Sequence, residues 1–363
     1  MNQRLLSLDV LRGMTIAGMI VVNNGAGGTS FIPLEHAEWN GLTPCDLVFP
    51  FFLFMVGVSI AFALGRYSPA SGQALDKGPA LRKICVRTLK MFLIGLLLNA
   101  SGQLLKGTSL PDTLATLRVW GILQRIAVCY GLTSLILLYV QPRHFGKIIF
   151  SLLTLYTGML LLGHGYVKGE ENIICLVDRA LFGQAHLYTK SPIDPEGLLG
   201  VIPSVAHTLI GVITGFFIKE KEELPQRLTR IFVLATCLAL AGYLLSFGLP
   251  LNKRIWSPSY VLVTCGIAAS LLATLTWVID FRKRRSWTPP LQWFGMNAIA
   301  LFVISMLLAQ VIKIWHIPAF LFDTYSRWGL GAEWASLAYA LTFLAVMTLV
   351  AYVMYRKKIF IKL

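Results

Sequence analysis

LEHAEWNGLTPCDLVFPFF, residues 34–52, joins a polar segment to an apolar one and sets the class of fold. Its first part contains His36, Asn40 and Asp46, and its second part continues as an apolar run to about residue 65. About 20 predominantly apolar residues suffice to cross the hydrocarbon core of a bilayer. The stretch therefore predicts a membrane-spanning helix that begins directly after a group of titratable and amide side chains.

The same apolar pattern recurs along the whole chain. Hydrophobic residues make up 56% of the 363 residues and charged residues only 13%, whereas soluble domains carry about a quarter charged residues. Ten apolar stretches predict ten membrane-spanning helices, at roughly 7–24, 45–65, 86–105, 119–140, 148–166, 198–218, 229–248, 259–280, 290–312 and 334–355. We therefore expect an all-α integral membrane protein with one domain over residues 1–363, folded as a single bundle.

Lysine and arginine are unevenly distributed between the connections. If the N-terminus is cytoplasmic, 21 of the 32 basic residues, Arg4 and Lys362 among them, lie on the cytoplasmic side and 9 on the outer side. This positive-inside bias predicts that both termini are cytoplasmic. Attraction to anionic lipid explains the formal charge of +15, so no nucleic-acid partner is expected.

Polar residues gather near the outer ends of several predicted spans. Asn23 and Asn24 end the first span, His36 precedes the second span and Asp46 begins it, and Arg125 lies about six residues into the fourth. Each has a structural alternative: a solvated loop histidine, a helix cap at Asp46, or a buried Arg125–Asp46 pair. Ionisable groups inside a bilayer normally face the protein interior or a wet cavity. Together these residues indicate an outer site.

A second polar group lies near the cytoplasmic face. Arg12 follows Asp9 by three residues on one side of the first helix, so the two can pair, or Arg12 can offer its guanidinium to an anionic ligand. Asn297 lies near the start of the ninth span. Polar groups at both ends of one bundle indicate a path through it. Transporters and membrane transferases share that feature, so the residues alone leave both open.

The six cysteines show neither CxxC nor metal-ligand spacing, and most lie in apolar stretches. Cysteine there behaves as a small hydrophobic residue. We therefore expect no disulfide and no metal.

Several sequence blocks, taken in chain order, carry a family resemblance. They are SLDVLRG (7–13), VVNNGAGG (21–28), EHAEWNGLTPCDLVFPFFLFMVG (35–57), RVWGILQRIAVCY (118–130), VDRALFGQAHLY (177–188), DPEGLLG (194–200), LNKRIWSPSYV (251–261) and WFGMN (293–297). The set resembles the heparan-α-glucosaminide N-acetyltransferase family and its bacterial relatives. The third block is highly specific, whereas LDVLRG alone also resembles the opening of other membrane acyltransferases.

The resemblance implies an integral-membrane enzyme that moves the acetyl group of cytosolic acetyl-CoA to the amino group of a glucosamine-type sugar on the periplasmic side. It places the family's essential histidine at His36, and its functional asparagine and aspartate at Asn23 and Asp46. Asn24 stands where the family often has an aromatic residue, so the choice between Asn23 and Asn24 stays open. The extra N-terminal domain of the animal enzyme is absent from this sequence. We therefore expect a bacterial inner-membrane protein that acts on free amino sugars or short saccharides.

This chemistry needs a base, because the amine of glucosamine is mostly protonated near neutrality. Histidine has a reference pKa of about 6.5, which suits the task. We expect His36 to act as the general base or as a transient acetyl acceptor, with Asp46 or Asn23 orienting its ring or holding the acceptor.

The expected contacts to acetyl-CoA are Arg12, Asn297 and Arg125, which lie inside the bundle. The basic segments 82–87 and 282–285 could also hold the nucleotide, but the positive-inside bias already accounts for them. The expected contacts to the sugar are Asn40, Asn252, Trp256, Ser257, Asp194 and Glu196. Trp256 could instead anchor the chain at the membrane interface. The expected partners are the amino sugar, acetyl-CoA, the lipid bilayer and, as the one assembly considered, a second copy of the chain. The alternative function is transport of an amino sugar or its N-acetyl derivative.

Overall fold

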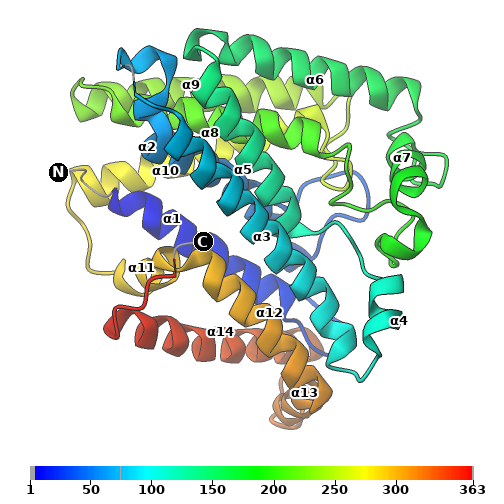
Figure 1. Ribbon diagram of the computed structural model, residues 1–363. Helices are drawn as coiled ribbons and strands as arrows, with labels where there is room; N and C mark the ends of the chain where they lie inside the picture. The colour runs from blue at the N-terminus through cyan, green and yellow to red at the C-terminus, as the bar shows by residue number, and fades with distance from the viewer. Residues whose placement is uncertain (1–4, 74, 362–363) are drawn as a thin grey trace.

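A computed structural model describes residues 5–73 and 75–361, and within these ranges the secondary structure is entirely helical (Figure 1). Nine of the described helices are long and apolar enough to cross a membrane, and the number is ten if a bent helix pair is counted as one span. The all-α fold is therefore confirmed, and the helices follow the order of the predicted spans. Arg4 and Lys362, two of the charges used to predict the topology, lie outside the described residues.

The spans follow one another with short connections on one side of the bundle and longer ones on the other. They are α1 (Leu6–Asn23), α2 (Val48–Leu64), α3 (Gly78–Leu104), α5 (Ile122–Tyr139), α6 (Phe145–Leu162), α8 (Val201–Lys219), α9 (Leu224–Leu245), α10 (Pro258–Leu275), the pair α11 (Pro289–Met296) and α12 (Ala298–Ile314), and α14 (Ala332–Arg356). A 3-10 turn, Pro44–Leu47, precedes α2, and a π-helical turn, Thr276–Phe281, extends α10. The third predicted span begins eight residues earlier than expected, at Gly78.

The ninth predicted span, 290–312, is not one straight helix. Helices α11 and α12 meet at an angle of 86°, and Asn297 between them has a non-helical backbone conformation. Gly295 packs directly against the backbone of Asp9, where a Cβ atom would overlap the carbonyl oxygen. A Cβ atom on Gly13 would likewise overlap the carbonyl oxygen of Leu291, so α11 packs antiparallel against the first half of α1.

Helices α2 and α8 form the centre of the bundle. In α8, 78% of the apolar span is buried, against 22% in α6 and in α9. A Cβ atom on Gly57 would overlap the carbonyl oxygen of Thr208, and one on Gly211 would overlap that of Phe54. These two glycines therefore let the backbones of α2 and α8 touch, as small residues do in membrane helix pairs. Figure 1 shows α6 and α9 along one edge and α14 along the opposite edge.

The two ends of the bundle differ in their connections. At one end, which we call the basic face, α1 begins, α14 ends and the connections are short (left in Figure 1). At the other end, which we call the loop face, lie the longer connections and the short helices α4 (Leu110–Ala115), α7 (Ile173–Phe182) and α13 (Ile317–Arg327) (right in Figure 1). These three helices were not predicted from the sequence.

Candidate active site

Two cavities lie toward opposite ends of the bundle. The basic-face cavity has a volume of about 790 Å³ and the loop-face cavity about 260 Å³. Helices α1, α2 and α5 contribute residues to both. On α2, Phe52 lines the first cavity and Phe49 the second, and three residues correspond to only about 4.5 Å along a helix axis. The two cavities therefore approach each other within the bundle.

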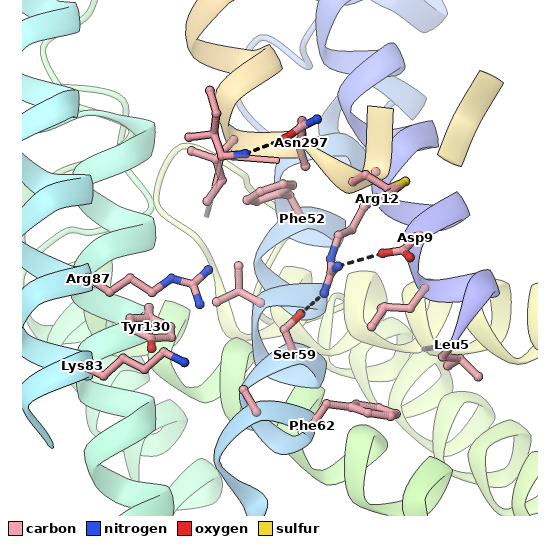
Figure 2. Close-up of a pocket in the computed structure, with 18 of the residues that line it drawn as sticks. Leu5, Asp9, Arg12, Phe52, Ser59, Phe62, Lys83, Arg87, Tyr130 and Asn297 are labelled. Carbon is pink, nitrogen blue, oxygen red and sulfur yellow. Dashed lines mark hydrogen bonds and ion pairs between the residues drawn. The ribbon is translucent and has the colours of Figure 1, made fainter. Parts of the chain in front are cut away.

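The basic-face cavity has an excess of positive charge (Figure 2). Among the described residues, one carboxylate, Asp9, lines it together with five cationic side chains, which are Arg12, Lys83, Arg87, Lys90 and Lys219. The three cations from α3 are spaced four and three residues apart and thus share one helix face. Figure 2 shows Lys83 and Arg87 pointing from α3 toward Arg12. The cavity is suited to a ligand that carries several negative charges.

Arg12 is fixed at the wall between α1 and α2. Its Nη1 atom lies 3.2 Å from the Asp9 carboxylate, and its Nη2 atom donates to the Ser59 hydroxyl. Arg87 lies over the ring of Tyr130, 4.6 Å from its centroid. Both guanidinium groups are thus held in place by side chains of the cavity.

Asn297 also lines this cavity, but its amide is engaged by another part of the chain. Its Nδ2 atom donates to the carbonyl oxygen of Ile359 at 2.9 Å, and its Oδ1 atom accepts from the backbone N–H of Ile361 at 3.0 Å. Ile361 itself lines the cavity. Asn297 therefore fixes the segment 359–361 as part of the cavity wall.

At the loop face, Asp46 is a buried carboxylate with a full set of donors. It stands in the 3-10 turn that precedes α2, where its Oδ2 atom accepts from the Thr43 backbone N–H at 3.1 Å and from the Thr43 hydroxyl at 3.0 Å. The Ala37 N–H donates to the same oxygen at 3.2 Å. The Thr-x-x-Asp spacing forms a capping box. Thr43 is the N-cap of this turn and Asp46 is its N3 residue, so the prediction of Asp46 as the N-cap is wrong, but the capping box fixes the carboxylate.

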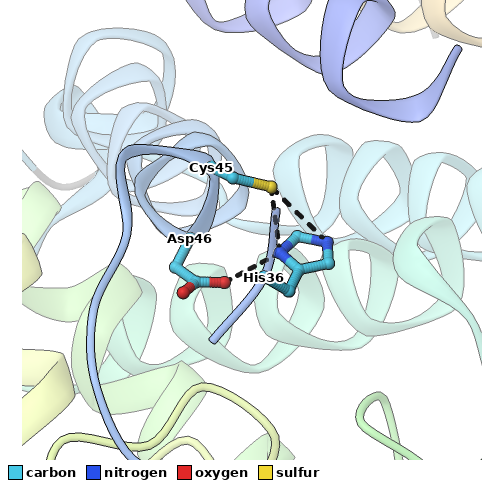
Figure 3. A group of neighbouring side chains, drawn as sticks. All are labelled: His36, Cys45 and Asp46. Atoms are coloured by element: carbon cyan, nitrogen blue, oxygen red, sulfur yellow. Dashed lines mark hydrogen bonds and ion pairs between the residues drawn. The ribbon is translucent and has the colours of Figure 1, made fainter. Parts of the chain in front are cut away.

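His36 lies against this carboxylate (Figure 3). Its Nδ1 atom is 2.8 Å from Asp46 Oδ1, and half of the His36 side chain is exposed while Asp46 is buried. We assign the tautomer in which Nδ1–H donates to Asp46, because a carboxylate can only accept. Nε2 then keeps its lone pair, as a general base or a nucleophile requires.

Lys253 completes this group, although its sequence position indicated only a charge on the outer side. Its Nζ atom lies 3.0 Å from His36 Nδ1 and 3.3 Å from Asp46 Oδ1. The preceding Asn252 accepts the Ile255 N–H in a tight turn and donates to Asn40 at 3.1 Å. The turn is thereby attached to the segment that carries His36. Only the folded chain brings residues 36, 46 and 253 together.

Comparison with known proteins identifies a family. The sequence matches the profile of the family described as heparan-alpha-glucosaminide N-acetyltransferase, catalytic, over residues 4–246. The chain belongs to this family. It is 28% identical to the human heparan-alpha-glucosaminide N-acetyltransferase and 27% identical to the mouse protein, in each case over 99% of the chain. The chain spans about 60% of the length of these two relatives.

The family match includes the His36–Asp46 pair and the parts of α1, α2 and α5 that line the two cavities. Lys253 and Asn297 lie beyond the matched residues.

Cys45 lies beside the His36–Asp46 pair and adds a third side chain of a type that can bind a metal ion. Its Sγ atom is 3.0 Å from His36 Nδ1, and the ligand atoms of His36, Cys45 and Asp46 lie within 4.8 Å of one another. The sequence spacing gave no sign of this cluster. Thiolate, imidazole and carboxylate groups can bind zinc, but the Lys253 ammonium already contacts the imidazole and the carboxylate. A metal ion could bind here only after Lys253 had moved away.

The structure distinguishes the two candidate asparagines of this family member. Asn23 is exposed and lines the loop-face cavity. Asn24 is buried, and its Nδ2 atom donates to the carbonyl oxygen of Ile20 at 2.7 Å. Asn23 is thus the asparagine that a ligand in the cavity can reach.

Two predicted sugar contacts lie near the loop-face cavity. Glu196 lines the cavity, whereas Asp194 is buried in the protein and does not line it. Arg118 donates to Asp194 at 2.9 Å and to Glu196 at 2.6 Å, and Asp194 is buried. Burial lowers the pKa of the Arg118 guanidinium, but the hydrogen bond with Asp194 and the charge of Glu196 outweigh this effect and raise it. Asp194 is therefore a support for the cavity wall, with its oxygens already engaged.

Four other predicted contacts line neither cavity, because the fold uses them internally. Trp256 is buried between the Arg125 guanidinium, 5.3 Å from the ring centroid, and the His207 ring. Arg125 is buried as well and donates to the carbonyl oxygen of Gly197 at 3.0 Å. Ser257 caps α10 and accepts the N–H of Asn252 at 3.0 Å. We predicted Arg125 as a cofactor contact and Asn252, Trp256 and Ser257 as sugar contacts. The structure instead buries these four side chains inside the protein, away from the linings of both cavities.

Asn40 is exposed but does not line the loop-face cavity. Its Oδ1 atom accepts from Asn252. Its place in the structure is thus at the junction of the two loops that carry His36 and Lys253.

Proposed function

We propose that this protein is an integral-membrane acetyltransferase that moves the acetyl group of acetyl-CoA to the amino group of a glucosamine-type sugar. The observation that carries the proposal is the pair of cavities on shared helices, which approach within about one turn of α2. A donor bound at the basic face can extend its acyl end toward the His36–Asp46 pair. The names of the human and mouse relatives support the same reaction class.

The basic-face cavity is the proposed donor site. Coenzyme A carries several negative phosphate charges, and five cations with one carboxylate line this cavity. Lys83, Arg87 and Lys90 of α3 are assigned to the phosphates, because charge-assisted hydrogen bonds to phosphate are strong. Arg12 lies deeper, between α1 and α2, and is assigned to the arm that leads toward the loop face.

The loop-face cavity is the proposed acceptor site. His36 Nε2 takes a proton from the attacking amine, and Asp46 holds the ring in the required tautomer and stabilises the imidazolium that forms. Asn23 and Glu196 line the same cavity and are assigned to the sugar. Attack of the amine on the thioester directly, or on an acetyl group first carried by Nε2, uses the same arrangement.

The distribution of charge supports an orientation for the transfer. The connections of the basic face carry most of the lysines and arginines, which favours a cytoplasmic position for this face and for both termini. Acetyl-CoA then enters from the cytosol, and the sugar binds on the periplasmic side of a bacterial inner membrane.

Reconstituted protein tests this proposal. Proteoliposomes that contain glucosamine inside and receive labelled acetyl-CoA outside should accumulate labelled N-acetylglucosamine inside, in the fraction of protein with its basic face outward. Protease accessibility of a tag after residue 361 measures that fraction.

Two outcomes would contradict the proposal. One is the absence of acetyl transfer to any amino sugar by folded protein that binds coenzyme A. The other is sugar uptake that needs no acetyl-CoA and leaves the sugar unmodified, which would instead identify a transporter with two opposed cavities.

A further inference from the structure

Lys253 is the cation of the loop-face cavity that contacts the His36–Asp46 pair. We propose that Lys253 is a catalytic residue of the acetyl transfer, and that its ammonium group stabilises the negative charge that develops on the carbonyl oxygen of the thioester. The inference rests on the proposed function and adds a second chemical group to it.

The position of the ammonium group supports this role. Nζ lies 3.3 Å from Asp46 Oδ1 and 3.0 Å from His36 Nδ1. In the tautomer assigned above, Nδ1 carries a proton, so Asp46 is the acceptor for Lys253 in this pair. An ammonium group has three N–H donors, and Lys253 lines the cavity. Donors therefore remain for a carbonyl oxygen placed beside Nε2.

The neighbouring charged groups are less suited to this role. Arg118 lines the cavity, but its guanidinium is engaged by Asp194 and Glu196. Arg254 lines it too, but within the described residues the hydrogen bonds and ion pairs to the side chains of His36 and Asp46 come from Lys253 and from the 37–45 segment. Lys253 is therefore the group that joins a positive charge to the reacting imidazole.

In the proposed reaction, the nitrogen of the sugar replaces the sulfur of coenzyme A on the acetyl carbon. The amine nitrogen forms a bond to the thioester carbon, and the C=O π electrons move to the oxygen, which accepts a hydrogen bond from Lys253. His36 Nε2 removes a proton from the nitrogen. The oxyanion then re-forms C=O, the C–S bond breaks, and coenzyme A leaves as a thiolate. Removal of one donor to such an oxyanion typically lowers kcat by about 10²–10³-fold.

Kinetics of two substitutions test the charge requirement. Lys253→Met should lower kcat for transfer to glucosamine by about 10²–10³-fold with little change in the KM for acetyl-CoA, whose phosphates bind at the other cavity. Lys253→Arg keeps the charge and should recover part of the rate. The matched control is Lys106→Met, at an exposed loop-face lysine that lines neither cavity, and it should retain wild-type kinetics.

An infrared measurement separates charge stabilisation from a merely structural role. [1-¹³C]Acetyl-CoA is bound to the His36→Ala protein, which should not turn over, with either Lys253 or Met at position 253. A hydrogen bond from an ammonium polarises the carbonyl, so its stretching band should lie at lower wavenumber when Lys253 is present. Loss of that difference, or a kcat within threefold of wild type for Lys253→Met, would overturn the role of Lys253. Absence of transfer by the wild-type protein would instead overturn the proposed function.

Discussion

The two cavities are built and charged in different ways. The basic-face cavity lies mainly between helices, and its five cations face one carboxylate. The loop-face cavity depends on connections, and most of its charged groups are paired: Asp46 contacts His36 and Lys253, and Arg118 contacts Glu196. The basic-face cavity thus has an excess of positive charge that can attract an anionic ligand, whereas most charged side chains of the loop-face cavity are held in place by ion pairs with one another.

This difference indicates a division of labour within one bundle. Excess charge on rigid helices favours tight binding of a polyanion, because each contact replaces solvent with an opposite charge. Balanced charge with many hydrogen bonds favours a fixed arrangement of reacting groups, which lowers the barrier to reaction. Substitutions in the first cavity should therefore change affinity, and substitutions in the second should change the rate or the stability.

The largest effect is expected at His36. His36→Ala should lower kcat by about 10²–10⁴-fold, the usual contribution of a general base, and should leave the dissociation constant of coenzyme A unchanged. Acetyl transfer and titration calorimetry measure the two quantities on the same preparation. The control is His164→Ala, at an exposed loop-face histidine outside both cavities. Weaker coenzyme A binding in His36→Ala would show that the two cavities are not separate in function.

Arg118 should control the stability of the loop face. Arg118→Met leaves the buried Asp194 without its guanidinium partner, and an uncompensated buried charge of this kind costs about 3 kcal/mol. Thermal unfolding in detergent measures the change. The matched control is Arg179→Met, whose partner Glu170 is largely exposed, so a change below about 1 kcal/mol is expected. Equal losses in the two variants would show that the burial of Asp194 does not matter.

The fold could be predicted largely from sequence, because hydrocarbon admits few alternatives to long apolar helices. The length and apolarity of a segment give no information on the bend at Asn297. The bend depends on contacts of Gly295 with Asp9 and of Asn297 with the segment 359–361. The short helices α4, α7 and α13 were also missed, since their segments are too short or too polar to register as spans.

The part of the site that lies within one sequence segment could be predicted. The part that forms where distant segments meet could not. His36 and Asp46 stand ten residues apart in one motif, and the structure joins them directly. Lys253 was missed because its partner lies 217 residues away. Trp256 was assigned to the sugar site because of its residue type, and Arg125 to the cofactor site because it is a charged residue inside a span. In the structure both side chains are buried and pack against each other. The spacing of Lys83, Arg87 and Lys90 was a usable signal, since it places three cations on one helix face.

That spacing leads to a test of the basic-face cavity. The double substitution Lys83→Gln and Arg87→Gln removes two charge-assisted contacts of about 1.5 kcal/mol each, so the KM for acetyl-CoA should rise about 100-fold while kcat stays near wild type. The control is Arg82→Gln, on the same helix but outside the cavity, which should change neither value. A large fall in kcat with unchanged KM would place the phosphates elsewhere.

The smallest effect is expected at Asp178 of α7, whose environment contrasts with that of Asp46. Both carboxylates are buried, but Asp178 accepts only the Leu198 N–H, at 3.0 Å, within the described residues. Burial raises the pKa of Asp178 from 3.8 to about 6. A raised pKa in the folded state adds stability below the unfolded value, and this stability is lost as the pH rises through about 6.

The wild-type protein should therefore lose about 2 kcal/mol of stability between pH 4 and pH 7 through this group, and Asp178→Asn should remove that loss. Melting temperatures of both proteins across this pH range give the comparison. Asp112→Asn, at an exposed carboxylate of α4, should keep the wild-type slope. Parallel curves for the wild type and Asp178→Asn would show that the Asp178 carboxylate is solvated or paired. In that case Asp178, like Asp46, would be a buried carboxylate whose charge is stabilised by neighbouring groups or by water.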